Sequence, residues 1–449
     1  MRVAPLLVGA LLFAAGCREP APTPGASQPG VLAQPPRRAA GEPKAPGISG
    51  ETVRLTARHA SGVPLHAAPG DSGVSARLAD GTSARVLSRA QDGQWLEITT
   101  EAGERGWITR RYVAAETSPA LPRAEPTSPS SPSSSAFRSR ADCLRALGAG
   151  ERLPRATGTA RLGTWNLRWF PDGRPGTRPK EGQGQDLEWL ACSIAWLGVD
   201  ALAVQEIKRY PGARERAAEL IARLDVHTKG AWQLRLDDCP NDAVQHVGIL
   251  YDARKVRAGD FETYGALNPH GEACAGSLRP GFGAYLRWPR GLDLTFVSVH
   301  LKSGPGARDA ELRRRSIASF GTVVDQIHAN RRDADVVFAG DFNTMGCESC
   351  RPSLTSASEI DDLPLAAALH RVPAEGSCSE YYDGRGGLLD HFVVTSALRT
   401  LSRGGGARVS GFCAAAACES LPRRRMPEAY TELSDHCPLI LDLDDRTRD

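Results

Sequence analysis

Apolar and polar positions follow two different periods between residues 160 and 445. Short apolar runs predict buried strands at 161–167, 201–204, 247–250, 283–286, 294–299, 336–339, 392–395 and 439–443. Apolar residues at helical spacing, such as Leu187, Leu190 and Ile194, predict helices at 186–197, 211–224 and 307–329. Many strands with few helices indicate a sandwich of sheets with helices outside.

Residues 51–115 have a different texture. Short alternating runs, as at 53–55 and 95–98, are separated by turn residues, which predicts a small all-β barrel. Segments 64–70, 93–96 and 106–108 resemble the bacterial Src-homology-3-like family. That resemblance implies contact with cell-wall peptides or other proteins, and the alternative is a spacer domain.

Two further segments cannot bury a core. Residues 18–50 are rich in Pro, Ala and Gly, and residues 116–137 centre on a Ser/Pro run at 128–135. Such compositions behave as flexible tethers and linkers. The chain after residue 17 therefore divides into a tether, a barrel, a linker and one long domain at 138–449.

The N-terminus has the layout of an export signal. Met1-Arg2 precedes an apolar run to Phe13 that is too short for a stable membrane span, and small residues then lead to Cys17. This resembles a bacterial lipobox and implies a signal peptide at 1–17, with Cys17 as the lipid-modified first residue. The alternative is an ordinary signal peptide with an incidental cysteine. We expect an exported protein that a lipid, and no transmembrane span, anchors in the bacterial cell envelope, at the outer membrane or cell surface.

Cysteine usage agrees with export. Besides Cys17 there are ten cysteines, and all of them lie at or beyond Cys143. An even number in an oxidising compartment predicts disulfides, whose pairing the sequence does not reveal. Cys347 and Cys350 have the spacing of half a zinc site, but no second pair matches it, so we interpret them as disulfide-forming. The net charge of +3 provides no general basic field, so any affinity for nucleic acid must come from a site.

Polar residues stand where the predicted strands of the long domain end. They occupy 164–166, 205–206, 299–302, 340–343, 389–391 and, before the last strand, 434–436. Side chains at strand ends lie at a sheet edge, where sites are commonly built. Carboxylates and carboxamides suit Mg²⁺, with Mn²⁺ or Ca²⁺ as alternatives, and imidazoles supply acid and base. The sequence has no P-loop, Gly-x-Ser-x-Gly or His-Glu-x-x-His motif.

These clusters, in this order, resemble the exonuclease/endonuclease/phosphatase superfamily. Its members include pancreatic deoxyribonuclease, abasic-site endonucleases, neutral sphingomyelinases and inositol-polyphosphate phosphatases. The resemblance covers 160–445. It implies an α+β fold, a four-layer α/β/β/α sandwich of two mixed sheets, and divalent-metal-dependent hydrolysis of phosphodiesters.

Matching positions carry the roles that the resemblance implies. Asn166 and Glu206 would hold the divalent metal, with Asp435 as a further ligand of the metal or its water. His436 would be the general base. Asp390 would orient the His436 ring and stabilise its cation, since a neighbouring carboxylate raises the pKa of an imidazole.

Other matching positions would face the substrate phosphate. Asp341 and Asn343 would bind the phosphate and the attacking water. His300 would contact the phosphate or protonate the leaving oxygen. Arg279 resembles the family's phosphate-binding arginine, whose paired donors fit a phosphate edge. His391 follows the Asp390 position and is interpreted as structural, outside the site.

One position departs from the family pattern. Some family nucleases have an acidic partner for the histidine that matches His300, and this chain has Gln245 at the position we align with it. A glutamine can orient the ring but cannot stabilise an imidazolium as a carboxylate does. The departure weakens the interpretation of His300 as a strong acid.

The substrate is predicted from the reaction class alone. We expect a monomeric nuclease acting on DNA or RNA. The alternatives are a sphingomyelinase-like or inositol-phosphate hydrolase and, in another class, a catalytically inactive envelope-binding protein, which the complete ligand set disfavours. Arginine runs at 313–315 and 423–425 are interpreted as solvated faces, with contact to a polyanion as the alternative for the second.

Overall fold

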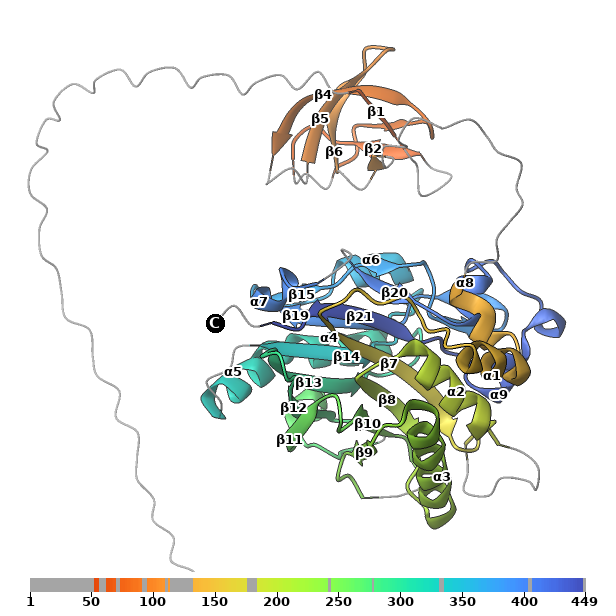
Figure 1. Cartoon of the computed structure of the whole chain (residues 1–449). Coiled ribbons are helices and arrows are strands. Elements are labelled where there is room, and N and C mark those ends of the chain that lie inside the picture. The colour runs from red at the N-terminus through yellow and green to blue at the C-terminus, as the bar shows by residue number, and fades with distance from the viewer. Residues whose placement is uncertain are drawn as a thin grey trace, which may run out of the picture. The chain divides into compact units, whose positions relative to one another are not determined.

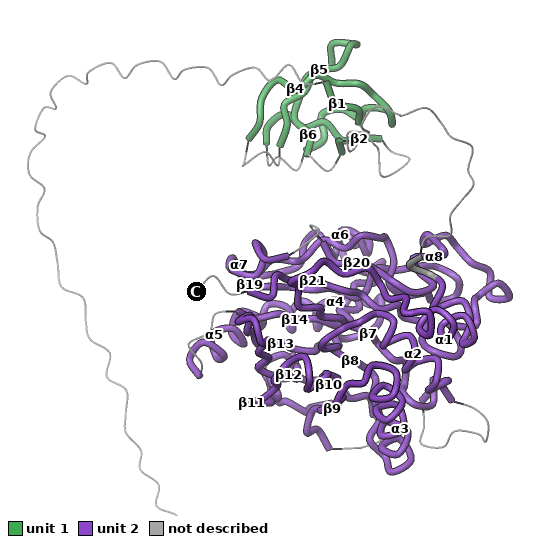
Figure 2. Tube along the Cα trace, viewed as in Figure 1, with its two compact units in different colours: residues 1–125 green, residues 126–449 purple. Residues whose placement is uncertain are grey.

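The computed structural model divides the chain into two compact units, residues 1–125 and 126–449, which are described separately (Figure 2). It describes residues 52–55, 62–69, 73–90, 95–109, 112–113, 132–175, 184–240, 244–276, 278–330, 335–402 and 406–446. The predicted signal segment with Cys17, the tether and most of the predicted linker lie outside these residues. No helix in the described ranges is both long and apolar enough to cross a membrane.

The described residues of unit 1 form a small β domain, as predicted. One antiparallel sheet has the order β1-β4-β5-β6, with β1 at Thr52–Arg54, β4 at Ser83–Ala90, β5 at Trp95–Thr100 and β6 at Arg105–Thr109. A ribbon pairs β2 (Val63–Leu65) with β3 (Ala76–Leu78). Leu55, Val63, Val86, Ile98 and Ile108 are buried between them. The likeness of this unit to the Src-homology-3-like family stays a prediction.

Unit 2 contains two large mixed sheets. The seven-stranded sheet runs in the order β16 (Ala374–Glu375), β20 (Ala407–Val409), β21 (Leu439–Asp444), β7 (Thr159–Phe170), β8 (Ala201–Ile207), β10 (His246–Asp252), β9 (Trp232–Leu236). The six-stranded sheet runs in the order β11 (Arg257–Tyr264), β12 (Gly281–Arg287), β13 (Asp293–His300), β14 (Val336–Asp341), β19 (Asp390–Thr395), β15 (Leu369–Arg371). A separate ribbon pairs β17 (Glu380–Tyr382) with β18 (Arg385–Gly387).

The two sheets face each other, because β7 and β8 contact β13 and β14. Helices α1 (Arg140–Gly148), α2 (Leu187–Leu197) and α3 (Pro211–Thr228) pack beside the seven-stranded sheet, and α4 (Ala307–Ala318) and α5 (Phe320–Asn330) beside the six-stranded one (Figure 1). Short helices complete the unit: α6 (Ser356–Asp361), α7 (Ser396–Arg399), α8 (Phe412–Ala415), α9 (Glu428–Glu432) and 3-10 turns at Pro132–Phe137, Gly265–Leu267 and Arg423–Arg425. The predicted four-layer sandwich is confirmed.

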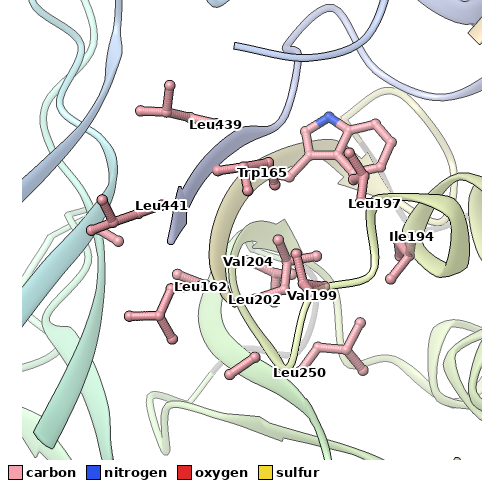
Figure 3. Close-up of a cluster of buried hydrophobic side chains, with 14 of the residues drawn as sticks. Leu162, Trp165, Ile194, Leu197, Val199, Leu202, Val204, Leu250, Leu439 and Leu441 are labelled. Atoms are coloured by element: carbon pink, nitrogen blue, oxygen red, sulfur yellow. The ribbon is translucent and has the colours of Figure 1, made fainter. Parts of the chain in front are cut away.

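The helix α2 shows how local sequence produces this packing. Asp186 caps its N-terminus by accepting a hydrogen bond from the Trp189 amide, and Gly198 ends it in the left-handed conformation. Between these caps the helix is almost entirely buried. Figure 3 shows Ile194 and Leu197 of α2 in one apolar cluster with strand residues such as Val204. Burial of this helix against the seven-stranded sheet holds in place the strands whose ends carry the polar residues.

Three sequence predictions differ from the structure in detail. The helix predicted at 307–329 is divided at Ser319, whose amide is shared by the carbonyls of Arg315 and Ser316 and whose hydroxyl also donates to Arg315. The predicted linker reaches too far, since Phe137 is already buried in the core of unit 2. The arginine run at 313–315 is not wholly solvated, because Arg313 is buried and forms a bidentate pair with Glu359.

The ten cysteines after Cys17 form five disulfides, all in unit 2, as predicted. The pairs are Cys143–Cys192, Cys239–Cys274, Cys347–Cys350, Cys378–Cys418 and Cys413–Cys437. Cys347 and Cys350 are bonded to each other, in agreement with their interpretation as disulfide-forming residues. A covalent cross-link restricts the unfolded chain and thereby stabilises the folded unit.

Candidate functional site

The polar strand ends of the two sheets meet at one edge of the sandwich. Asn166 and Glu206 come from β7 and β8, and Asp341 comes from β14 of the other sheet. The Asn166 amide nitrogen donates to Glu206 Oε1 at 3.1 Å and to Asp341 Oδ2 at 3.0 Å. One side chain therefore joins the two sheets at the site.

His436 and Asp390 form a tight pair beside Asp341. His436 Nδ1 lies 2.9 Å from Asp390 Oδ2, and its Nε2 lies 3.6 Å from Asp341 Oδ2. The Ser379 hydroxyl donates to the same Asp390 oxygen at 2.7 Å. Burial alone would lower the pKa of His436, but Asp390 and Asp341 raise it well above its ordinary value. This imidazole is therefore built to stabilise a positive charge.

His300 also lies beside this carboxylate. Its Nε2 is 3.5 Å from Asp341 Oδ2 and 3.8 Å from Glu206 Oε1. Its Nδ1 is buried without a hydrogen-bond partner among the described residues. Burial lowers the pKa of His300 well below its ordinary value, and the positive charges of Arg279 and His436 add to the shift. This imidazole stays neutral.

Gln245 does not orient His300. Its backbone carbonyl and its amide oxygen both accept hydrogen bonds from Arg279. The glutamine that we aligned with the partner of His300 therefore holds the predicted phosphate-binding arginine, which corrects our expectation that it could orient the ring. Burial also lowers the pKa of Arg279, with the charge of Glu206 acting in the opposite direction.

Local backbone geometry places two more of the predicted residues. Glu206 has a φ of 64°, and its Oε2 accepts the Trp169 amide at 2.9 Å. Asn343 has a φ of 52°, its amide nitrogen donates to the Leu301 carbonyl at 3.0 Å, and its backbone N–H donates to Asp341 Oδ1 at 2.9 Å. Positive φ is costly for such residues and is often kept where it aims a functional group. Burial raises the pKa of Glu206.

Asp435 lies at the rim of the site. Its side chain is 24% exposed, against 2% for Asp341, and its Oδ2 lies 3.5 Å from Arg168 Nε. Arg168 also donates to the Tyr430 carbonyl at 3.0 Å and lies over the Tyr430 ring. Sequence reasoning missed Arg168, although it stands two residues beyond Asn166 and its backbone N–H donates to Asn166 Oδ1 at 2.9 Å.

Glu380 is a second residue that the sequence did not indicate. It lies on the short strand β17 and pairs through its backbone with His436. Burial raises its pKa to about 8, with His436 acting in the opposite direction. Burial likewise raises the pKa of Asp341 to about 7, although His436 opposes the shift. Several carboxyl groups thus share one buried region.

The structure places His391 outside the catalytic pair. Its Nε2 lies 2.9 Å from the Thr344 hydroxyl, and burial lowers its pKa to about 3. The three arginines of the run at 423–425 are exposed on a 3-10 turn. Neither observation adds a member to the site.

The donor set fits a divalent cation. In the described part of the chain, one group of three His and acidic residues has all its ligand atoms within 4.8 Å of one another, namely Asp341, Asp390 and His436. His436 Nδ1 is already engaged with Asp390, so we interpret this group as an acid–base pair beside a carboxylate. Asp390 Oδ1 is buried without a hydrogen-bond partner among the described residues. Burial raises the pKa of both Asp341 and Glu380, and a hard cation at the site would favour their charged forms.

Comparison with known proteins gives distant structural likenesses. No family model matches the chain, and no curated protein matches its sequence. An endonuclease/exonuclease/phosphatase from Bacteroides vulgatus is 16% identical over 64% of this chain and 98% of its own, with a TM-score of 0.42. TDP2 of D. rerio, complexed with a single-strand DNA product, is 16% identical over 63% of this chain and 98% of its own, with a TM-score of 0.42. The human Nocturnin catalytic domain with bound sulfate is 15% identical over 65% of this chain and 94% of its own, again with a TM-score of 0.42. Likenesses at this level carry no argument about activity, which must rest on the geometry of the site.

Proposed function

We propose that unit 2 is a divalent-metal-dependent phosphodiester hydrolase. The observation that carries the proposal is the oriented His436–Asp390 pair, whose free Nε2 faces a buried carboxylate cluster 3.6 Å away. A general base needs one ring nitrogen held by an acceptor and the other open toward water. The structure offers that arrangement beside groups suited to a cation.

The proton path follows from these contacts. With Nδ1–H directed at Asp390, His436 Nε2 would take a proton from a water held beside both Nε2 and the Asp341 carboxylate. The water oxygen forms a bond to phosphorus while the bond from phosphorus to the leaving oxygen breaks. The leaving oxygen then takes up a proton from solvent water, and the His436 imidazolium returns its proton to solvent. Asp390 stabilises the imidazolium that forms, which is the physical consequence of its charge.

The remaining residues bind and neutralise charge. A divalent cation supplies Lewis-acid stabilisation of the charge that develops on the phosphoryl oxygens. Glu206 and the Asn166 carboxamide would hold it, with Asp435 at the rim as a further ligand. His300 is neutral and lies within 4 Å of both Asp341 and Glu206, so it suits a hydrogen bond to the phosphate better than the role of an acid.

We further propose that the substrate is DNA or RNA and that the protein acts outside the cytoplasm. Arg168 at the rim and the exposed arginines at 423–425 are cations that a polyanion would meet near the site. The five disulfides of unit 2 support an oxidising compartment. The lipid anchor at Cys17 remains part of this proposal.

One assay tests the proposal. The oxidised full chain is incubated with plasmid DNA, RNA, sphingomyelin and inositol phosphates, with Mg²⁺ or with EDTA. We expect Mg²⁺-dependent cleavage of nucleic acid that Glu206→Gln abolishes. Cleavage of lipid or inositol phosphate without cleavage of nucleic acid would redirect the substrate assignment. No cleavage of any phosphate ester by a folded protein would refute the hydrolase.

A further inference from the structure

A second polar feature lies at the end of the sandwich opposite the candidate site. Strands β10 and β12 begin near the site, at His246 and Gly281, and end away from it, at Asp252 and Arg287. A cavity of about 330 Å³, which we call the basic groove, lies beside these far ends. It is lined by Ala253, Arg254, Lys255, Val256, Arg257, Arg287, Trp288 and Pro289. The described lining holds four cationic side chains and no carboxylate.

Two of these cations face each other directly. Arg257 of β11 and Arg287 of β12 are cross-strand partners in the antiparallel ladder, and both are exposed. Like charges at directly opposed positions destabilise a sheet. Arg287 is also the register partner of Asp293 on β13, which accepts the Tyr285 hydroxyl, and its guanidinium lies over the Tyr285 ring. Among the described residues neither arginine forms an ion pair with a carboxylate. Two like charges thus lie side by side at the groove.

The other two cations add to this charge. Arg254 donates to the Lys229 backbone carbonyl at 2.8 Å, which leaves its positive charge unneutralised. Lys255 Nζ lies 3.4 Å from Asp200 Oδ1, but that carboxylate is also held by Arg155 at 2.7 Å. Three guanidinium groups therefore keep the groove positive. Repulsion among them is relieved when an anion lies between them.

We propose that the basic groove binds the phosphate group of a small phosphorylated ligand. The planar guanidinium offers paired donors that match a phosphate edge, and several of them suit a dianion. A volume of about 330 Å³ accommodates an organic group beside the phosphate. Such a phosphate has two sources, a soluble phosphate ester or a lipid headgroup.

The groove is separate from the proposed hydrolytic site. The seven residues of β12 span roughly 20 Å, since a strand rises about 3.3 Å per residue. A small ligand in the groove therefore does not reach His436. The proposal is independent of the hydrolase function, and a failure of either leaves the other intact.

The experiment uses the full chain and a double variant, Arg257→Gln with Arg287→Gln. Binding of pyrophosphate is measured by calorimetry in EDTA, and binding to vesicles of equal parts phosphatidylglycerol and phosphatidylcholine by co-sedimentation. The matched control carries Arg314→Gln and Arg399→Gln, which remove two exposed arginines elsewhere on unit 2. We expect the double variant to weaken binding by about tenfold or more while the control binds as the wild type does.

Each outcome decides the proposal. Weakened pyrophosphate binding supports a soluble ligand, and weakened vesicle binding alone supports a lipid headgroup. Equal losses in the control, or binding to duplex DNA with no affinity for pyrophosphate or vesicles, would overturn it. The thermal midpoint of the double variant in phosphate-free buffer is expected to match or exceed that of the wild type, because the repulsion is removed. A clear fall would show that the two arginines serve the fold, which also overturns the proposal.

Discussion

Two imidazoles lie within 4 Å of one carboxylate oxygen, and their pKa values shift in opposite directions. His436 Nε2 is 3.6 Å and His300 Nε2 is 3.5 Å from Asp341 Oδ2, and both rings are buried. The difference lies at the other ring nitrogen, which Asp390 holds in His436 and which has no described partner in His300. Asp390, together with Asp341, therefore raises the affinity of His436 for a proton, whereas burial and the charges of Arg279 and His436 lower that of His300.

Removal of His436, the histidine whose pKa is raised, should have the largest effect on activity. We expect His436→Ala to lower kcat by about 10² to 10⁴, because general-base catalysis typically contributes that much. The measurement is Mg²⁺-dependent cleavage of the substrate found in the survey above. His370→Ala is the matched control, since His370 contacts the Ser396 hydroxyl away from the site. Equal losses in the two variants would remove the general-base role.

The variant Asp390→Asn tests the neighbour itself. We expect kcat to fall by about 10-fold to 100-fold, as for partners that orient a functional histidine. Loss of the carboxylate charge lowers the pKa of His436, and a base is active when deprotonated. The rising limb of the pH–rate profile should therefore move to lower pH. A limb that stays in place would show that another group sets it.

The variant His300→Ala tests the contribution of the neutral imidazole. We expect a loss of about tenfold or less, since a neutral ring contributes one hydrogen bond to the phosphate. The rising limb of the pH–rate profile should not move, because the pKa of His300 lies well below the measured range. A shift of that limb as large as the one in Asp390→Asn would contradict the assignment.

The smallest expected effect is a change with pH in the free energy of unfolding when no divalent cation is bound. Asp341 and Glu380, with pKa values raised to about 7 and about 8, hold protons in the folded state that they release in the unfolded state. His436, whose pKa is raised, acts with the same sign. In EDTA the free energy of unfolding should therefore fall as pH rises from 6.5 to 8, by up to about 1.4 kcal/mol per pH unit for each such proton.

Single variants distinguish the contributions of His436 and His300 to this pH dependence of the unfolding free energy. Asp341→Asn, Glu380→Gln and His436→Ala should each flatten the decline of unfolding free energy, measured by urea titration at several pH values. His300→Ala should leave it unchanged, because His300 is neutral in both states above its ordinary pKa of 6.5. Added Mg²⁺ at pH 8 should restore stability, since deprotonated carboxylates bind the cation. A free energy of unfolding that rises between pH 6.5 and 8 would contradict the pKa shifts.

Long apolar runs were the predictable part of the fold. The strand predicted at 336–339 is β14, which continues to Asp341 because its ladder with β19 extends to Asp390. Helix α1 was not predicted, since its polar sequence buries little beyond Cys143, Ala146 and Leu147. The edge strand β9 was also not predicted: its apolar and polar residues alternate, but the run is short and its hydrogen bonds depend on β10.

The site was predictable where a motif and a strand end coincide. Asn166, Glu206, Asp341, Asp390 and His436 converge as their strand positions indicate. Glu380 and Arg168 were missed because tertiary contacts, a bridge to His436 and a turn with positive φ, bring them to the site. The pairing of Gln245 with Arg279 could not be predicted from the sequence either, because the two residues lie in separate loops that only the folded chain brings together.

Two disulfides lie beside the His436–Asp390 pair. Cys437, directly after His436, is bonded to Cys413, and Cys378, directly before Ser379, is bonded to Cys418. Both cross-links therefore restrain a partner of Asp390. A chain whose thiols are still reduced lacks these restraints, so the proposed hydrolase would become active only after it is oxidised. The double variant Cys413→Ser with Cys437→Ser should lose activity while it keeps its secondary structure. The double variant Cys143→Ser with Cys192→Ser, which removes the cross-link between α1 and α2, should instead mainly lower the free energy of unfolding.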